Sequence, residues 1–251
     1  MLLALQILIV LGAIVLGARL GSIAIGFAGG LGVLLLGVTG VPVTAEDIPF
    51  DVIGIIMCVI AAISAMQRAG GMDYLVHLAE KFLRRNPKQI TLWAPVVTWL
   101  MTVFAGTGHT AFSTLPVIVE VAKEGKVRPS RPLSVAVIAS QMAIVASPIS
   151  AAVVFMASIL EPLGVSYLTL LGIMIPATFL AIIPTSLLTN RLGKELEDDP
   201  VFQDRLAKGL VREPVAQSTW VPPKGARASV WIFLVAIIGV MLYATAISEQ
   251  V

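Results

Sequence analysis

The sequence FAGTGHTAFSTLP, residues 104–116, is a polar, glycine-containing stretch between two apolar runs that cover residues 90–105 and 114–122. Basic residues lie outside both runs: Lys81, Arg84, Arg85 and Lys88 come before the first, and Lys123, Lys126, Arg128 and Arg131 follow the second. Lys and Arg collect on the cytoplasmic flanks of membrane segments. Both ends of this region are therefore expected on the cytoplasmic side.

The region is too short to cross a membrane twice. Each crossing takes about 20 residues, so residues 90–122 cannot hold two crossings and a turn. They predict a re-entrant hairpin whose tip lies near the middle of the bilayer. Irregular backbone at that depth is tolerated only where protein or a water-filled cavity surrounds it. The tip is therefore expected to line a cavity.

The composition of the 251-residue chain predicts an all-α polytopic membrane protein in contact with the lipid bilayer. Hydrophobic residues make up 57% of the chain and charged residues only 13%, and the apolar runs exclude a soluble domain of the same length. The net charge of +2 gives no reason to expect a nucleic-acid partner. The single cysteine, Cys58, lies within an apolar run, so it predicts neither an internal disulfide nor a metal site.

The distribution of charge predicts the topology. Lys and Arg occur only at residue 19 and in residues 68–88, 123–131 and 191–227, and the loops between these segments carry acids alone. The expected crossings are residues 2–18, 22–41, 51–67, 132–160, 167–190 and 229–247. This order predicts a multi-pass protein with both termini outside, which in a bacterium means the periplasm. Residues 2–18 lack a basic region before Leu2, so a removed signal peptide is not expected.

Three further segments have simpler interpretations. The dense glycines of residues 12–37 predict close helix packing in lipid, and no strand precedes Gly30 as a dinucleotide site would need. Residues 72–85, after a break at Gly70-Gly71, have the period of an amphipathic helix lying on the inner membrane surface. Residues 191–228 are expected to be a cytoplasmic linker, with one short helix at 201–211 and no chemistry of its own.

The segment Ala146-Ser147-Pro148-Ile149-Ser150-Ala151 predicts a break in the helix of residues 132–160. Proline removes a backbone donor and clashes with the preceding turn. Ser147 is suited to cap the second half of the helix, with Pro148 at its first position. An ordinary kink is the alternative.

The hairpin tip and the broken helix together predict an anion site. A helix N-terminus carries free N–H groups and partial positive charge, so two that converge can hold a carboxylate without a buried Arg or Lys. The membrane segments contain no Asp, Glu, Lys or Arg at that depth, and only His109 is ionisable there; it is either a neutral donor or a packing residue. The expected substrate-binding residues are Gly106, Thr107, Gly108, His109, Thr110, Ser113, Thr114, Ser147, Pro148 and Ser150. No cofactor is expected; a coupling Na⁺ or H⁺ is left open, since carbonyls at helix C-termini can hold Na⁺.

At these residues the chain resembles the anaerobic C4-dicarboxylate uptake (Dcu) family over its whole length. The stretches that carry the resemblance are Gly17-Ala18-Arg19, Gly70-Gly71-Met72-Asp73, Leu83-Arg84-Arg85-Asn86-Pro87-Lys88, Ala105-Gly106-Thr107-Gly108-His109 and Ala146-Ser147-Pro148-Ile149-Ser150. The resemblance implies a secondary transporter, by antiport or uptake, of fumarate, succinate, malate and aspartate in bacteria respiring without oxygen. It also implies the repeat of the ion-transporter superfamily, with its re-entrant hairpin and broken transmembrane helix, and a homodimer formed through scaffold helices.

Members of that family are longer than this chain. We therefore expect residues 1–190 to be a first transmembrane repeat, residues 191–228 a linker, and residues 229–251 the first helix of a second half. A non-transporting membrane partner or co-sensor of a signalling kinase is the alternative function. An enzyme is not expected, because Ser113 and His109 do not form an oriented pair of nucleophile and base.

Overall fold

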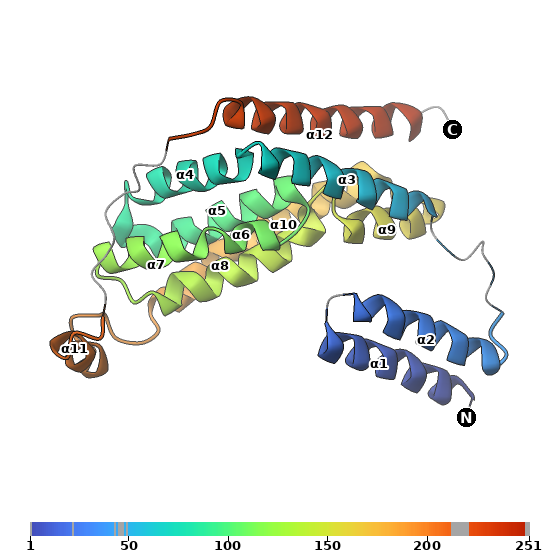
Figure 1. The fold of residues 1–251 in the computed structure, drawn as a ribbon, viewed down its shortest axis with the longest axis horizontal. Helices are drawn as coiled ribbons and strands as arrows, with labels where there is room; N and C mark the ends of the chain where they lie inside the picture. The colour runs from blue at the N-terminus through green and yellow to red at the C-terminus, as the bar shows by residue number, and fades with distance from the viewer. Residues whose placement is uncertain are drawn as a thin grey trace. The chain divides into compact units, whose positions relative to one another are not determined.

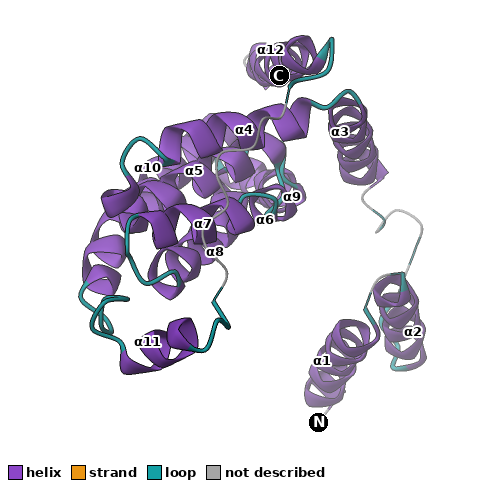
Figure 2. Cartoon of the chain, turned by 60° about the vertical axis from the view of Figure 1, so that its left-hand side comes forward, coloured by secondary structure: helices purple, strands orange, loops and turns teal. Residues whose placement is uncertain are grey.

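A computed structural model describes residues 2–21, 23–42, 44, 48, 50–211 and 221–248 of the chain. The described residues form helices joined by loops, and no strand occurs among them, as Figure 2 shows. The helices are α1 (Leu2–Leu20), α2 (Ala24–Val38), α3 (Phe50–Arg68), α4 (Gly71–Leu83), η2 (Pro87–Gln89), α5 (Ile90–Ala105), α6 (His109–Phe112), α7 (Leu115–Glu124), α8 (Ser130–Ala143), η3 (Ile144–Ala146), α9 (Ala151–Leu160), η4 (Glu161–Leu163), α10 (Tyr167–Asn190), α11 (Pro200–Ala207) and α12 (Ala226–Ser248). They divide into two compact units, residues 1–51 and 52–251.

The first unit is the helical hairpin of α1 and α2. The turn follows Leu20 at Gly21, whose φ of +68° lies in the left-handed region that favours glycine. A Cβ on Gly32 would lie 2.9 Å from the Ala13 Cβ, and one on Gly17 would lie 3.3 Å from the Ile25 Cα. Small residues at these two positions therefore let the helices approach closely, which confirms the packing role predicted for them.

In the second unit, α5 packs against both α8 and α10 (Figure 1). Its buried polar side chains fix these contacts. The Thr98 hydroxyl donates to the Ala136 carbonyl of α8 at 2.9 Å, and the Trp99 indole N–H donates to the Thr178 hydroxyl of α10 at 3.1 Å. The second bond gives the buried Trp99 N–H a partner, and both bonds link buried polar groups of neighbouring helices.

The break predicted at Gly70-Gly71 is confirmed. Gly70 has a φ of +80° between α3 and α4, and a Cβ on Gly71 would lie 2.6 Å from the Ser229 Oγ of α12. The amphipathic helix predicted after the break is α4. Met72, Ala79 and Leu83 are buried in the main core beside residues of α5, α7 and α12.

Other predicted segments match closely. The crossing predicted at 167–190 has the same bounds as α10, and the short helix predicted at 201–211 is α11, which ends four residues earlier, at Ala207. Within the described residues, three helical segments are long and apolar enough to cross a membrane: Leu2–Leu20, Ser130–Leu163 and Tyr167–Asn190. Shorter apolar helices cover Ala24–Val38, Ile56–Arg68 and Ala226–Gly239.

Candidate functional site at the hairpin tip

The chain from α5 to α7 turns back on itself, so that the end of α7 lies beside the start of α5. Helix α5 ends at Ala105, and the short α6 leads into α7. A Cβ on Gly125, after α7, would lie 2.6 Å from the Pro87 carbonyl oxygen before α5. Arg84 forms an ion pair with Glu124 across the same two ends. Residues 90–124 therefore form a helical hairpin with a tip at residues 106–114.

The predicted break is observed between η3 and α9. Ser147 and Ser150 have extended backbone, with ψ of 123° and 143°. Ser150 is the residue that caps α9, because its Oγ accepts a hydrogen bond of 3.2 Å from the Val153 N–H. The prediction that Ser147 caps this helix with Pro148 at its first position is wrong by three residues. The extended Ser150 allows the helix to restart only after it.

The hairpin tip lies directly against this break. The Ser147 hydroxyl donates a 2.6 Å hydrogen bond to the Val103 carbonyl in the last turn of α5. Gly106 has a φ of +70°, and a Cβ there would lie 3.1 Å from the Ile149 carbonyl oxygen. Only glycine allows both this backbone conformation and this approach.

Gly108 makes the second close approach of the tip. A Cβ at this position would overlap the amide nitrogen of Gln141, an exposed side chain of α8. Two glycines of the tip therefore contact two parts of the broken helix, Ile149 after η3 and Gln141 before it.

A cavity of about 330 Å³ lies where the tip, the break and α3 meet. Gly106 and Thr107 line it from the tip, and Ile149 and Ala151 from the broken helix. Residues of α3 complete the wall, and the polar ones among them are Ser64 and Gln67. Sequence reasoning missed these two residues because α3 has the composition of an ordinary membrane crossing, in which nothing singles out a site.

The remaining predicted residues have different environments. The Thr110 hydroxyl donates to the Thr107 carbonyl at 2.9 Å and borders a separate apolar cavity of about 440 Å³ between α4, α5 and α12. Thr114 is buried and donates to the Ala111 carbonyl at 2.6 Å, whereas Ser113 is exposed. His109 begins α6, and its side chain lies outside the described parts of the chain.

Pro148 is half-buried, and its carbonyl accepts a hydrogen bond from the Tyr167 hydroxyl at the start of α10. Ser150 is also buried. The structure thus brings Gly106 and Thr107 to one cavity with the start of α9, while Ser147 and Ser150 hold the surrounding backbone in place.

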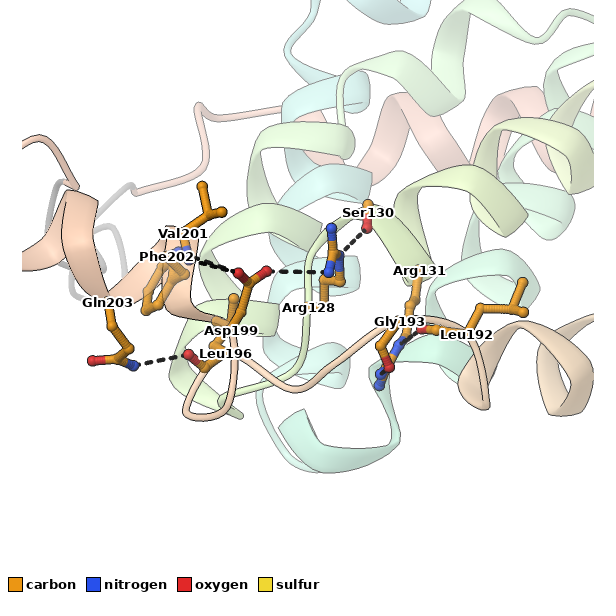
Figure 3. A network of polar contacts seen from close by, with 10 residues as sticks. All are labelled: Arg128, Ser130, Arg131, Leu192, Gly193, Leu196, Asp199, Val201, Phe202 and Gln203. Carbon is orange, nitrogen blue, oxygen red and sulfur yellow. Dashed lines mark hydrogen bonds and ion pairs between the residues drawn. The ribbon is translucent and has the colours of Figure 1, made fainter.

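Ion pairs join residues 126–131, which end in the first turn of α8, to residues 192–199. Arg131, which is only 5% exposed, donates to the carbonyls of Leu192 at 2.6 Å and Gly193 at 2.7 Å, and its Nη1 lies 2.5 Å from Glu195 Oε1. Figure 3 shows this guanidinium reaching both carbonyls.

Two more pairs extend the same contact. Arg128 binds Asp199 at 3.2 Å, and the Asp199 side chain also caps α11. Lys126 binds Glu197 at 2.5 Å; this hydrogen bond and the attraction between the charges raise the pKa of Lys126 and lower that of Glu197. The sequence analysis predicted a linker here and named none of these bonds, since residues about 60 to 70 apart leave no pattern in the sequence.

Comparisons with known proteins agree with the resemblance found in the sequence. The family model described as anaerobic C4-dicarboxylate membrane transporter matches residues 2–251. The chain is 61% identical over 246 residues to the C4-dicarboxylate transporter DcuA of Wolinella succinogenes, covering 98% of this chain and 56% of that protein. It is 58% identical over 243 residues to DcuA of Escherichia coli K12, covering 96% and 55% of the two chains.

A third relative, DcuA of Helicobacter pylori strain J99, is 51% identical over 246 residues, which cover 98% of this chain and 55% of that protein. The chain thus spans about half the length of the curated relatives it matches. No solved structure matches it. With a family match over residues 2–251 and relatives at 51–61% identity, the chain belongs to the DcuA/DcuB family of anaerobic C4-dicarboxylate membrane transporters.

Proposed function

We propose that this chain is the hairpin-bearing repeat of a secondary carrier that exchanges or takes up C4-dicarboxylates across the bacterial inner membrane. Fumarate, succinate, malate and aspartate are the proposed substrates. Residues 1–190 are the first transmembrane repeat, residues 191–228 the linker, and residues 229–251 the first helix of a second half. The homodimer contact is assigned to scaffold helices outside the hairpin.

The cavity at the hairpin tip is the observation that carries this proposal. Its volume of about 330 Å³ lies at the lower end of the range for ligand pockets, roughly 300–1,000 Å³. Gly106 of the tip and Ala151 at the start of α9 both line it, and neither has a side chain longer than a methyl group. A small ligand can therefore reach backbone N–H groups.

The N-terminus of α9 supplies electrostatic attraction for an anion. Ser150 satisfies the Val153 N–H, but Ala151 and Ala152 are exposed at the first positions of the helix. Their N–H groups have no partner within the helix, and the helix dipole places partial positive charge there. Ala151 also lines the cavity, so the partial positive charge at the start of α9 lies beside the space that a carboxylate would occupy.

The clustering of basic segments supports a re-entrant hairpin. Contacts between Arg84 and Glu124 and between Arg131 and residues 192–195 bring three basic segments together at one end of the second unit. Basic loops face the cytoplasm, so this clustering supports a topology in which both ends of residues 90–124 lie inside and the tip lies within the bilayer. The N-terminus is then periplasmic.

Substrate exchange would test the function directly. The chain is expressed in place of the 246 matching residues of DcuA from Wolinella succinogenes, and proteoliposomes loaded with fumarate are assayed for uptake of labelled succinate. Exchange above that of empty liposomes is expected, with loss of roughly 5- to 150-fold in succinate affinity for Thr107→Val. Exchange by unaltered DcuA but none by the folded chimera would contradict the proposal. Ionophores that collapse the Na⁺ or H⁺ gradient would identify the coupling ion.

A further inference from the structure

The cavity wall that α3 forms is apolar along most of its length and becomes polar in its last two turns. Ile56, Ile60 and Ile63 line the cavity first, followed by Ser64 and Gln67. Positions three and four apart share one helix face, so these residues form a single stripe. Its polar end borders the same cavity as Gly106 and Thr107 of the hairpin tip.

The two polar residues of this stripe differ in whether their side-chain donors are available to bind a ligand. The Ser64 hydroxyl donates to the Ile60 carbonyl at 2.7 Å, so its hydrogen is already used. Gln67 is exposed, and within the described residues its side-chain amide has no hydrogen-bond partner; only its backbone carbonyl is used, by Gly70 N–H. An amide in apolar surroundings costs free energy unless it is bonded, and its NH₂ group offers two donors.

The uncharged lining of the cavity favours this amide as a group that binds the ligand. None of the side chains that line the cavity is charged. A dianion has two carboxylates, and a site that binds it must offer donors at both. The backbone N–H groups of α9 and the Thr107 hydroxyl lie on the wall formed by the tip and the broken helix, while Gln67 lies on the α3 wall.

We propose that the Gln67 amide binds the second carboxylate of the substrate, while the hairpin tip and the start of α9 bind the first. This assignment rests on the proposed function. It makes Gln67 the residue that selects dicarboxylates over monocarboxylates, because a site built to bond a polar group discriminates against a ligand that lacks it.

Ligand protection of cysteines tests the position of Gln67. In the same chimera with Cys58→Ser, single variants Gln67→Cys, Thr107→Cys and Ser158→Cys are alkylated with a maleimide, with and without saturating succinate. Ser158 is the matched control, because it is an exposed serine of α9 that does not line this cavity. Succinate is expected to slow labelling of residues 67 and 107 but not of residue 158.

The outcomes separate this inference from the proposed function. Protection of residue 107 without protection of residue 67 would overturn the role of Gln67 and leave the carrier function standing. Protection of neither, in a folded protein that binds no succinate, would overturn both. Protection of all three residues would indicate a global change in place of a binding site, and would also count against Gln67.

Affinity measurements test the role of the amide itself. Gln67→Ala is expected to weaken succinate binding roughly 10- to 100-fold and to leave butyrate binding unchanged, because butyrate has no second carboxylate. Gln67→Glu places an anion there and should weaken succinate binding further. Equal losses for succinate and butyrate, or no loss for succinate, would overturn the assignment. Because Gln67 is exposed and its amide unbonded, these variants are expected to fold.

Discussion

The hydrogen bond from the Ser147 hydroxyl to the Val103 carbonyl, 2.6 Å long, joins the break in the broken helix to the last turn of α5. Carbonyls in the last turn of a helix lack a partner further along it. Ser147 satisfies one of them in a fully buried place, at 0% exposure. The bond therefore fixes the position of the hairpin tip relative to the start of α9, and with it the shape of the cavity.

Ser147→Ala should destabilise the protein by about 1–3 kcal/mol, because it leaves the buried Val103 carbonyl without a donor. Ser158→Ala is the matched control: Ser158 is exposed and donates only to the Phe155 carbonyl one turn back. That variant should change the free energy of unfolding by no more than about 0.5 kcal/mol. Thermal unfolding in nanodiscs measures both, and equal shifts would argue against a structural role for the Ser147 bond.

Ser150→Ala should remove the cap of α9 and weaken succinate binding. Ser166 caps α10 in the same way, accepting from the Thr169 N–H at 3.2 Å, but it is exposed and away from the cavity. Each Ser→Ala substitution should cost about 1 kcal/mol in stability. Only Ser150→Ala should alter succinate affinity, measured by scintillation proximity in detergent. An equal effect of Ser166→Ala on affinity would show that α9 has no special role.

The sequence predicted the broken helix but misplaced its restart. Proline marks where a helix cannot continue, so the break at Pro148 was predictable from one residue. The residue that caps the next helix depends on which serine hydroxyl accepts from the first turn of α9, and both Ser147 and Ser150 combine extended backbone with a hydroxyl of the right kind. The choice was made by a tertiary contact, because the Ser147 hydroxyl is engaged by Val103 on another helix.

The same distinction applies to the site. Glycines and hydroxyls in an apolar region pointed to the tip, and Gly106 and Thr107 do line a cavity. Gln67 lies in α3, nearly 40 residues away along the chain, and a single amide at the end of an apolar helix carries no pattern. Its proximity to the tip follows only from the packing of the second unit.

Cysteine accessibility in intact cells should show which loops face the cytoplasm. With Cys58→Ser as background, Glu161→Cys should react with a membrane-impermeant maleimide from outside, and Lys126→Cys should react only after the cells are opened. The reason is the segregation of basic loops to the cytoplasmic side. Labelling of residue 126 from outside would exclude the re-entrant hairpin, because residues 90–124 would then have to cross the membrane fully.

Gly106→Ala should destabilise the protein more than Gly108→Ala, although both glycines lie in the tip. At position 106 an alanine would have to adopt a φ of +70°, which costs an L-residue about 1–2 kcal/mol. Its Cβ would also crowd the Ile149 backbone. At Gly108 the φ is −66°, and the overlapping group is the flexible end of Gln141. Unfolding in urea measures the difference, and comparable losses of stability would show that the tip is not held by its contact with Ile149.

Arg131→Lys should destabilise the contact between the first turn of α8 and residues 192–195, even though it keeps the charge. The planar guanidinium donates to two carbonyls and a carboxylate at once, and an ammonium group cannot reproduce that geometry. Because Arg131 is buried, we expect the free energy of unfolding to fall by about 2 kcal/mol or more.

Lys126→Ala serves as the control, since its pair with Glu197 is mostly exposed and such pairs contribute little. Limited proteolysis of residues 191–211, followed by mass spectrometry, should show faster cleavage in Arg131→Lys than in the parent chain and no change in Lys126→Ala. Equally fast cleavage in both variants would mean that exposed ion pairs, and not the buried arginine, hold this segment to the helices.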